Sequence, residues 1–247
     1  FDGENVISSN EALCLQAVPA DIVIVGGGVI GCEFACILAA LGSRVTVIEA
    51  LDRLLPLPSV DAACSKHLQR EMKKRKIKFM VKRTVEAVKT AGTKLKVTVG
   101  PSPFVDADSL SPREREPLEF ETEKVLVCIG RSPLSGDIGL DTIGVACDAR
   151  GWIMADEGLR TNVAGVYAIG DVTGKLALAH VASAQGIVAV ETIAGAETVT
   201  LDYEMLPRCT YCQPQVASFG ITEAQAAERG HQVKVGQFPF RAIGKAL

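Results

Sequence analysis

The sequence is poor in aromatic side chains and has no long apolar run, and these two absences exclude two broad classes of protein. Aromatic residues make up 5% of the 247 residues, too few for the stacking surfaces on which single-stranded nucleic acids bind. No stretch of about twenty apolar residues is free of charge, so no membrane-spanning helix is expected. The net charge of −3 at pH 7 offers no attraction to a polyanion. We therefore expect no nucleic-acid partner and no membrane attachment.

The sequence also lacks the marks of a secreted protein. It begins with Phe1 and shows no basic-then-apolar signal pattern, which suggests a piece of a longer chain or a processed form. Its eight cysteines are too sparse for a disulfide scaffold. The expected compartment is therefore a reducing one, the cytoplasm or, in a eukaryote, the mitochondrial matrix or plastid stroma. A composition of 48% hydrophobic and 22% charged residues predicts one large or two ordinary globular domains.

Residues 21–48 have the pattern of a strand, a helix and a second strand. The β-branched runs 21–25 and 44–48 are typical of buried parallel strands. Between them, 29–41 is mostly apolar, of helical length, and is followed by Gly42, a residue suited to a helix C-terminus. The unit has the roughly 30 residues expected of a βαβ crossover. The sequence thus predicts an α/β fold with a parallel sheet.

The rest of the chain predicts further elements and one long loop. Helices are expected over 60–75 and 179–193 and from Thr222, where Thr222-x-x-Gln225 is a capping-box pattern. Strands are expected over 77–81, 84–90 and 94–99, which alternate as antiparallel strands do, and over 124–129, 165–169 and 215–219. Residues 100–118 contain four prolines and mixed charge, so they predict a loop, to which the sequence assigns no function.

A glycine motif joins the first predicted strand to the first predicted helix. In Gly26-x-Gly28-x-x-Gly31, the first glycine permits a tight turn, the second lets the backbone approach a pyrophosphate, and the third lets the helix pack close to the strand. The helix N-terminus adds free N–H groups and the positive end of a dipole. A dinucleotide site is expected, with a glycine-rich turn that binds no nucleotide as the alternative. The expected site residues of this loop are Gly26, Gly27, Gly28, Val29, Ile30 and Gly31.

Glu49 ends the second predicted strand, about 20 residues beyond the glycine motif. A carboxylate at this place accepts hydrogen bonds from the hydroxyls of the adenine ribose. The same charge repels a 2′-phosphate. The motif therefore favours NAD over NADP as the cofactor.

Several motifs, in order along the chain, resemble those of the disulfide-reductase flavoproteins, the pyridine nucleotide-disulfide oxidoreductase family. The resemblance covers essentially the whole chain. It is greatest to the branch that oxidises a dihydrolipoyl group as the E3 component of 2-oxoacid dehydrogenase complexes. The motifs are Val25-Gly-Gly-Gly-Val-Ile-Gly-Cys-Glu33-Phe-Ala35, Ile129-Gly-Arg131-x-Pro133, Arg160-Thr-Asn162, Gly165-Val-Tyr-Ala-Ile-Gly-Asp171 with Leu178-Ala-His180-x-Ala182, and Tyr211-x-x-Pro214-x-Val-Ala217.

The resemblance implies a Rossmann-like NAD-binding domain inserted in a partial FAD domain, plus the start of an α+β dimerisation domain. The implied boundaries are 1–20 for the end of the first FAD half, 21–130 for the NAD domain, 131–205 for the second FAD half with the central segment, and 206–247 for the start of the interface domain. A homodimer is implied for the full-length protein. FAD and NAD are the implied cofactors.

The resemblance also implies roles for individual residues. Asp171 would bind the ribityl or pyrophosphate part of FAD. Ala179 and His180 would open a helix aimed at the flavin ring, whose dipole would stabilise negative charge on reduced flavin. Glu33 would lie near the nicotinamide and pair with a lysine beside the flavin. The residues expected to line the rest of the NAD site are Val85, Gly130 and Arg131.

The implied activity passes electrons from a dihydrolipoyl substrate through an enzyme disulfide and FAD to NAD⁺. The sequence has no Cys-x4-Cys pair and no His-x4-Glu, so the redox-active centre and the catalytic base are expected outside this chain. The chain alone is then expected to be inactive. Two alternatives stay open: a sibling reductase acting on glutathione or mercuric ion or as an NADH transhydrogenase, and a non-catalytic dinucleotide-binding module.

Other reactive side chains have simpler interpretations. Cys32 and Cys36 share one helix face, and without further ligands nearby they are expected to pack rather than bind metal. Cys209-x-x-Cys212 has the spacing of a redox pair, which we interpret as coincidence. The basic run 73–83 lacks interleaved aromatic residues and is interpreted as a solvated face.

Overall fold

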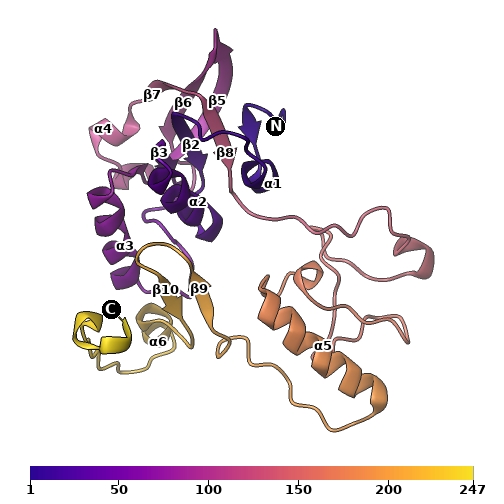
Figure 1. The fold of residues 1–247 in the computed structure, drawn as a ribbon. Helices are drawn as coiled ribbons and strands as arrows, with labels where there is room; N and C mark the ends of the chain where they lie inside the picture. Colours follow the sequence, from indigo (N-terminus) through magenta and orange to yellow (C-terminus); the bar gives the residue numbers. More distant parts are fainter. Residues whose placement is uncertain (247) are drawn as a thin grey trace.

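The computed structural model describes residues 1–246 and has a five-stranded parallel sheet at the centre of the N-terminal half (Figure 1). Along this sheet the strand order is β1-β8-β2-β3-β4. β2 (Asp21–Val25) pairs over its whole length with β3 (Arg44–Ile48), and α2 (Val29–Ala40) connects them. The predicted βαβ unit is therefore confirmed. The other elements of this sheet and its edge are β1 (Val6–Ile7), α1 (Ser9–Leu13), β4 (Lys78–Met80) and β8 (Lys124–Val127).

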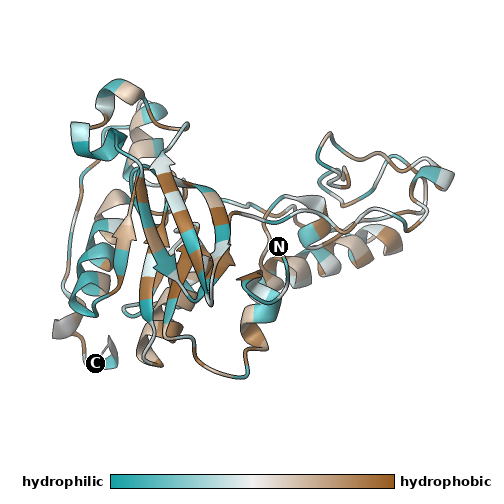
Figure 2. Cartoon of the chain, turned by 90° about the horizontal axis from the view of Figure 1, so that it is seen from above, coloured by the Kyte–Doolittle hydropathy of each residue, from teal (hydrophilic) through white to brown (hydrophobic). Residues whose placement is uncertain are grey.

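Two different layers cover the faces of this parallel sheet. Ile22 and Ile24 pack into one core with α2 and α3 (Ala62–Lys74), whereas Val23 packs into a second core on the opposite face. Successive side chains of a strand point to opposite faces, so a strand buried on both faces is apolar at every position. In Figure 2, brown hydrophobic segments alternate with paler and teal ones along the strands in front. The second core lies against an antiparallel sheet of β5 (Arg83–Ala91), β6 (Lys94–Pro101) and β7 (Leu118–Thr122).

The structure of two segments in this half differs from the one predicted from the sequence. The prediction of an antiparallel strand over 77–81 is wrong, because β4 pairs in parallel with β3 after the crossover through α3. The hairpin predicted from 84–90 and 94–99 is confirmed as β5 and β6. Residues 100–118 hold the short helix α4 (Pro112–Arg115) within the predicted loop, and the strand β7 that follows was not predicted.

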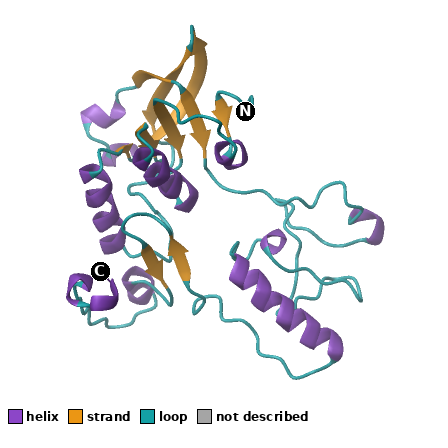
Figure 3. Ribbon diagram, viewed as in Figure 1, coloured by secondary structure: helices purple, strands orange, loops and turns teal. Residues whose placement is uncertain are grey.

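Residues 131–205 form a separate lobe whose main element is the helix α5 (Ala179–Ala194) (Figure 3). The predicted helix over 179–193 is confirmed. The strand predicted over 165–169 is wrong, since this segment makes only an isolated bridge between Arg160 and Tyr167. A strand needs a neighbouring backbone to pair with, and no strand is found between residues 131 and 205, all of which the structure describes.

The C-terminal segment packs against α2. β9 (Arg208–Thr210) and β10 (Val216–Ser218) form an antiparallel pair, and β10 confirms the strand expected near 215–219. α6 (Glu223–Glu228) starts with the predicted capping box at Thr222. Cys212 and Val216 are buried in the same core as α2. Among the described residues, no helix is both long enough and apolar enough to cross a membrane.

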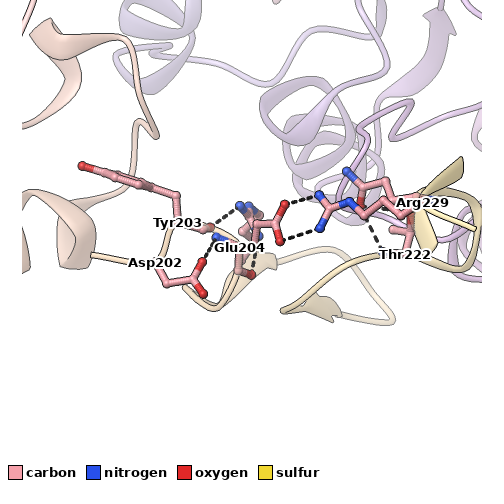
Figure 4. Close-up of polar contacts among 7 residues, drawn as sticks. Asp202, Tyr203, Glu204, Thr222 and Arg229 are labelled. Carbon is pink, nitrogen blue, oxygen red and sulfur yellow. Dashed lines mark hydrogen bonds and ion pairs between the residues drawn. The ribbon is translucent and has the colours of Figure 1, made fainter. Parts of the chain in front are cut away.

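Ionic and polar contacts fix the segment that leads from the lobe into β9 (Figure 4). Glu204 accepts a hydrogen bond at its carboxylate from Arg229 (3.0 Å). Its backbone N–H donates to Asp202 Oδ1 (2.9 Å), and Arg208 donates to the carbonyl of Tyr203 (2.6 Å). The hydrogen bond from Arg229 keeps the pKa of Glu204 below its usual value, because it favours the charged carboxylate.

Candidate functional site

A cavity of about 720 Å³ opens where β2, β3 and β8 end. Ligands of open α/β sheets bind at this carboxyl edge of the strands. Another cavity, of about 660 Å³, lies at the amino ends of the strands and contains none of the motif residues. The structure thus brings most of the predicted site together at the first cavity. The predicted residues that line it are Gly26, Gly28, Val29, Ile30, Glu49, Val85, Gly130 and Arg131.

The three glycines of the motif are needed for different structural reasons. Gly26 has a φ of 105°, in the left-handed region, and a side chain there would overlap the carbonyl oxygen of Cys128. A side chain on Gly31 would overlap the carbonyl of Gly26, so this glycine is needed for α2 to pack on β2. Gly28 is different, because no atom of the described residues lies within 4 Å of the place a Cβ would occupy. Gly26 and Gly31 therefore serve the fold, and Gly28 leaves space for a ligand.

Glu49 ties the glycine loop to the end of β3. Its side chain is almost buried, with 6% exposed. One carboxylate oxygen accepts the N–H of Gly27 (2.5 Å) and the other accepts the N–H of Leu51 (2.7 Å). A carboxylate has about four acceptor positions, so capacity remains for the hydroxyls of a ligand. The role of Leu51 was not predicted, since a backbone N–H leaves no mark in a sequence.

The wall formed by β5 corrects one sequence interpretation. Arg83 was assigned to a solvated basic face, but only 5% of it is exposed. Its guanidinium donates to the carbonyls of Arg113 (2.7 Å) and Glu116 (2.5 Å). A buried charge is held in place when its donors are satisfied in this way, and Arg83 therefore fixes the loop 100–118 beside the cavity. Cys128 also lines the cavity, and burial raises its pKa to about 11, so this thiol is neutral at pH 7.

An ion pair joins the cavity to the lobe. Arg131, which lines the cavity, lies 3.9 Å from the carboxylate of Asp171, and both side chains are largely exposed. Asp171 begins a short 3-10 turn directly after Gly170, whose N–H donates to Gln185 Oε1 (2.6 Å). Gln185 is fully buried in α5 and also donates to Tyr203 (3.0 Å). Sequence reasoning missed Gln185, although a lone amide within an apolar helix was a signal.

Three predicted residues lie away from the cavity. Ala179 and His180 are exposed at the start of α5, where no side chain caps the helix, and His180 Nε2 is 2.9 Å from the carbonyl oxygen of Pro207. Glu33 on α2 is outside the cavity lining and accepts the N–H of Tyr211 (2.7 Å). The cofactor roles of these residues stay predictions.

Of the cysteines singled out in the sequence, Cys32 and Cys212 are buried, Cys36 is half-buried and Cys209 is exposed. Cys32, Cys36 and Cys212 pack in one core, whereas Cys209 is exposed. A hydrogen bond between the thiols of Cys36 and Cys212, together with burial, raises the pKa of Cys36 far above its usual value. No group of three His, Cys, Asp or Glu side chains suited to a metal ion occurs among residues 1–246.

Comparisons with known proteins agree with this architecture. The profile of the pyridine nucleotide-disulphide oxidoreductase family matches residues 1–186, and that of its dimerisation domain matches residues 206–247. Dihydrolipoyl dehydrogenase of Mycobacterium leprae is 45% identical over 98% of this chain and 49% of its own length. The enzyme of Corynebacterium glutamicum is 46% identical over 99% of this chain and 50% of its own length, and that of Bacillus subtilis is 42% identical over 100% and 49%.

Solved structures show the same relationship. LpdA from Mycobacterium tuberculosis superposes with a TM-score of 0.85 at 26% identity, covering 100% of this chain and 50% of its own. The HOCl-induced flavoprotein disulfide reductase RclA from Escherichia coli gives 0.83 at 25% identity, covering 98% and 52%. This chain spans about half the length of the relatives it matches and belongs to the pyridine nucleotide-disulphide oxidoreductase family.

Proposed function

We propose that this chain forms the NAD-binding part and half of the FAD-binding part of a dihydrolipoyl dehydrogenase. The observation that carries its NAD-binding part is the almost buried carboxylate of Glu49, which lines the cavity and is hydrogen-bonded to the glycine loop. The relatives at 42–46% identity carry the name dihydrolipoyl dehydrogenase. The full activity would pass two electrons from a dihydrolipoyl dithiol through an enzyme disulfide and FAD to NAD⁺.

The residues at the cavity fit a dinucleotide. The open space at Gly28 would admit the pyrophosphate to the backbone. α2 begins there, and no side chain in the described part of the chain caps it. Glu49 would accept the hydroxyls of the adenine ribose and repel a 2′-phosphate. Val85, Gly130 and Arg131 would line the remainder of the site.

The lobe fits half of a flavin site. The N-terminus of α5 is uncapped by side chains and exposed at Ala179 and His180, so its N–H groups are available to a negatively charged partner. Asp171 would hold a hydroxyl of the flavin side chain. When bound, FAD would carry electrons and NAD⁺ would accept a hydride, while the chain positions and polarises both.

The proposed partners follow from the same relationship. The match of residues 206–247 to a dimerisation domain supports a homodimer of the full-length protein. The dihydrolipoyl substrate would be presented by the E2 component of a 2-oxoacid dehydrogenase complex. All eight cysteines are free thiols, which fits a reducing compartment such as the cytoplasm, the mitochondrial matrix or the plastid stroma.

A second candidate is a sibling disulfide reductase. The likeness to RclA, a disulfide reductase, at a TM-score of 0.83 favours this alternative. Glu49 and the glycine motif serve both candidates equally. The two candidates therefore differ in their substrate, and the cofactor site cannot distinguish them.

The test combines binding to this chain with turnover by the full-length protein. Titration calorimetry with NAD⁺ and NADP⁺ should show binding of NAD⁺ only, and Glu49→Ala should weaken it by roughly 10- to 100-fold, the loss of one or two charge-assisted hydrogen bonds. The full-length protein should carry flavin and reduce NAD⁺ with dihydrolipoamide. Flavin without this turnover would favour the sibling reductase, and a protein with neither flavin nor turnover would leave only a dinucleotide-binding module.

A further inference from the structure

We propose that Phe104, at the start of the 100–118 loop, stacks on the adenine ring of the bound dinucleotide. This inference rests on the proposed NAD site and assigns a binding role to a loop that carries none so far. Phe104 lines the same cavity as Glu49 and Val85. Its side chain nevertheless remains 73% exposed, so one face of an aromatic ring is available at the edge of the site.

A series of backbone contacts places Phe104 at the adenine end of the cavity. Leu51, whose N–H binds Glu49, accepts at its carbonyl the N–H of Lys82 (2.8 Å). The carbonyl of Lys82 accepts the N–H of Ser102 (3.0 Å), and Ser102 Oγ accepts the N–H of Phe104 (3.2 Å). Glu49 would bind the ribose to which adenine is attached, so the base would lie within one nucleoside of this carboxylate and next to Phe104.

The loop that carries Phe104 is held firmly on both sides of it. Ser102 is buried, with 4% exposed, and precedes the ring by two residues. On the far side, the buried Arg83 binds the carbonyls of Arg113 and Glu116, and Leu110 is buried with 6% exposed. An exposed aromatic residue between two such anchors loses little conformational freedom when a ligand covers it, because its backbone is already ordered.

Stacking is the interaction that these side chains can offer to a purine. Every base has a π-face, and base–aromatic stacking strengthens binding by a factor of about 5 to 150 per base, as judged by alanine substitution. Val85 and Leu51, which line the same cavity, would supply an aliphatic surface for the base. No acidic or basic side chain is needed for this contact, so it would act on the adenine of any adenine nucleotide that fits the cavity.

Calorimetric titration of the chain with NAD⁺, AMP and nicotinamide mononucleotide tests the assignment. Phe104→Ala should weaken NAD⁺ and AMP by about tenfold and leave nicotinamide mononucleotide unchanged, while Phe104→Trp should retain the wild-type affinities. Phe219→Ala is the matched control, since Phe219 is similarly exposed, at 66%, but lies outside the cavity. Thermal unfolding should be the same in all three variants, because both rings are exposed.

The outcomes separate this inference from the function on which it rests. Normal binding of AMP by Phe104→Ala, alongside weakened binding by Glu49→Ala, would overturn the stacking role and leave the NAD site intact. A wild-type chain that binds neither NAD⁺ nor AMP would overturn the NAD site and the stacking role together. An equal loss of affinity for nicotinamide mononucleotide would also overturn the inference, since stacking on adenine cannot affect a ligand without it.

Discussion

Two regions of the molecule have similar proportions of apolar residues but bury different numbers of them: the N-terminal unit, residues 1–130, and the lobe, residues 131–205. The N-terminal unit has a continuous parallel sheet with a core on each face. The lobe has two small groups of buried side chains and no strand in its described residues. Along α5, three large side chains are more than half exposed: Ile187 at 61%, Val190 at 64% and Ile193 at 62%.

This difference shows that a sequence pattern alone does not make a strand. In the N-terminal unit, β8 lies between β1 and β2 and bonds to both, so its backbone groups are paired on each side. The segment 165–169 has an equally apolar pattern, but no strand within residues 1–246 pairs with it. Relatives with about twice the length have further chain available to provide such a neighbour, as the proposed split FAD domain requires.

The largest expected effect separates the two roles of glycine in the N-terminal unit. Gly31→Val should destabilise this unit by about 3 kcal/mol or more, because its side chain would overlap the carbonyl of Gly26. Gly28→Ala should leave stability nearly unchanged and weaken NAD⁺ binding, since only a ligand competes for that space. Urea unfolding and calorimetry would measure the two effects. Equal stability of the two variants would contradict the assignment of Gly31 to packing.

A matched pair of valines compares the two regions directly. Val97 is fully buried between the sheets of the N-terminal unit, and Val188 is buried in the lobe with 4% exposed. Val97→Ala should cost about 2 kcal/mol in the free energy of unfolding, and Val188→Ala about 1 kcal/mol or less, because the thin packing around Val188 can collapse into the space. Hydrogen exchange, measured separately for amides of the N-terminal unit and of the lobe, would report both losses of stability. A larger loss at Val188 would show that the lobe is as tightly packed as the N-terminal unit.

The sequence predicted best where local pattern and tertiary structure agree. The βαβ unit was predictable because β-branched runs, a glycine turn and a helix of suitable length all specify the same structure. The direction of β4 was not, since parallel pairing depends on where α3 returns the chain. The cavity residues from Gly26 to Glu49 follow from the motif. Arg83 and Phe104 could not be predicted, because their positions depend on how an irregular loop folds back on β5.

Thiol reactivity should follow burial and not region, since the N-terminal unit also has exposed cysteines. Cys32, Cys36 and Cys212 are packed in the N-terminal core, and a raised pKa keeps Cys36 and Cys212 as unreactive thiols. Cys147 in the lobe is exposed. Iodoacetamide at pH 8 should therefore modify Cys147 within minutes and leave the core thiols intact until the chain is unfolded in urea. Mass spectrometry of the digested protein identifies the sites, and early modification of Cys36 would contradict the packed core.

The smallest expected effect concerns the contact that joins the lobe to the C-terminal segment. Because Arg229 lowers the pKa of Glu204 in the folded chain, this pair stabilises the fold above the pKa of the unfolded carboxyl and ceases to do so as the pH falls through the lowered value. Both side chains are nearly half exposed, at 46% and 48%, so the effect on stability is small. Glu204→Gln should lower the urea midpoint slightly at pH 7 and leave it unchanged at a pH below the folded pKa.

A double-mutant cycle with Arg229→Gln isolates this ion pair from other consequences of each substitution. The coupling should be present at pH 7, decrease in 1 M salt and vanish in acid, since it depends on the charge of one carboxylate. The ion pair connects only the lobe's exit segment to α6, so hydrogen exchange should change there and not in the parallel sheet. If breaking this pair lowered the protection of amides in β2 or β8, the two regions would be coupled through the C-terminal segment. They would then differ in how tightly they are packed but would not unfold independently.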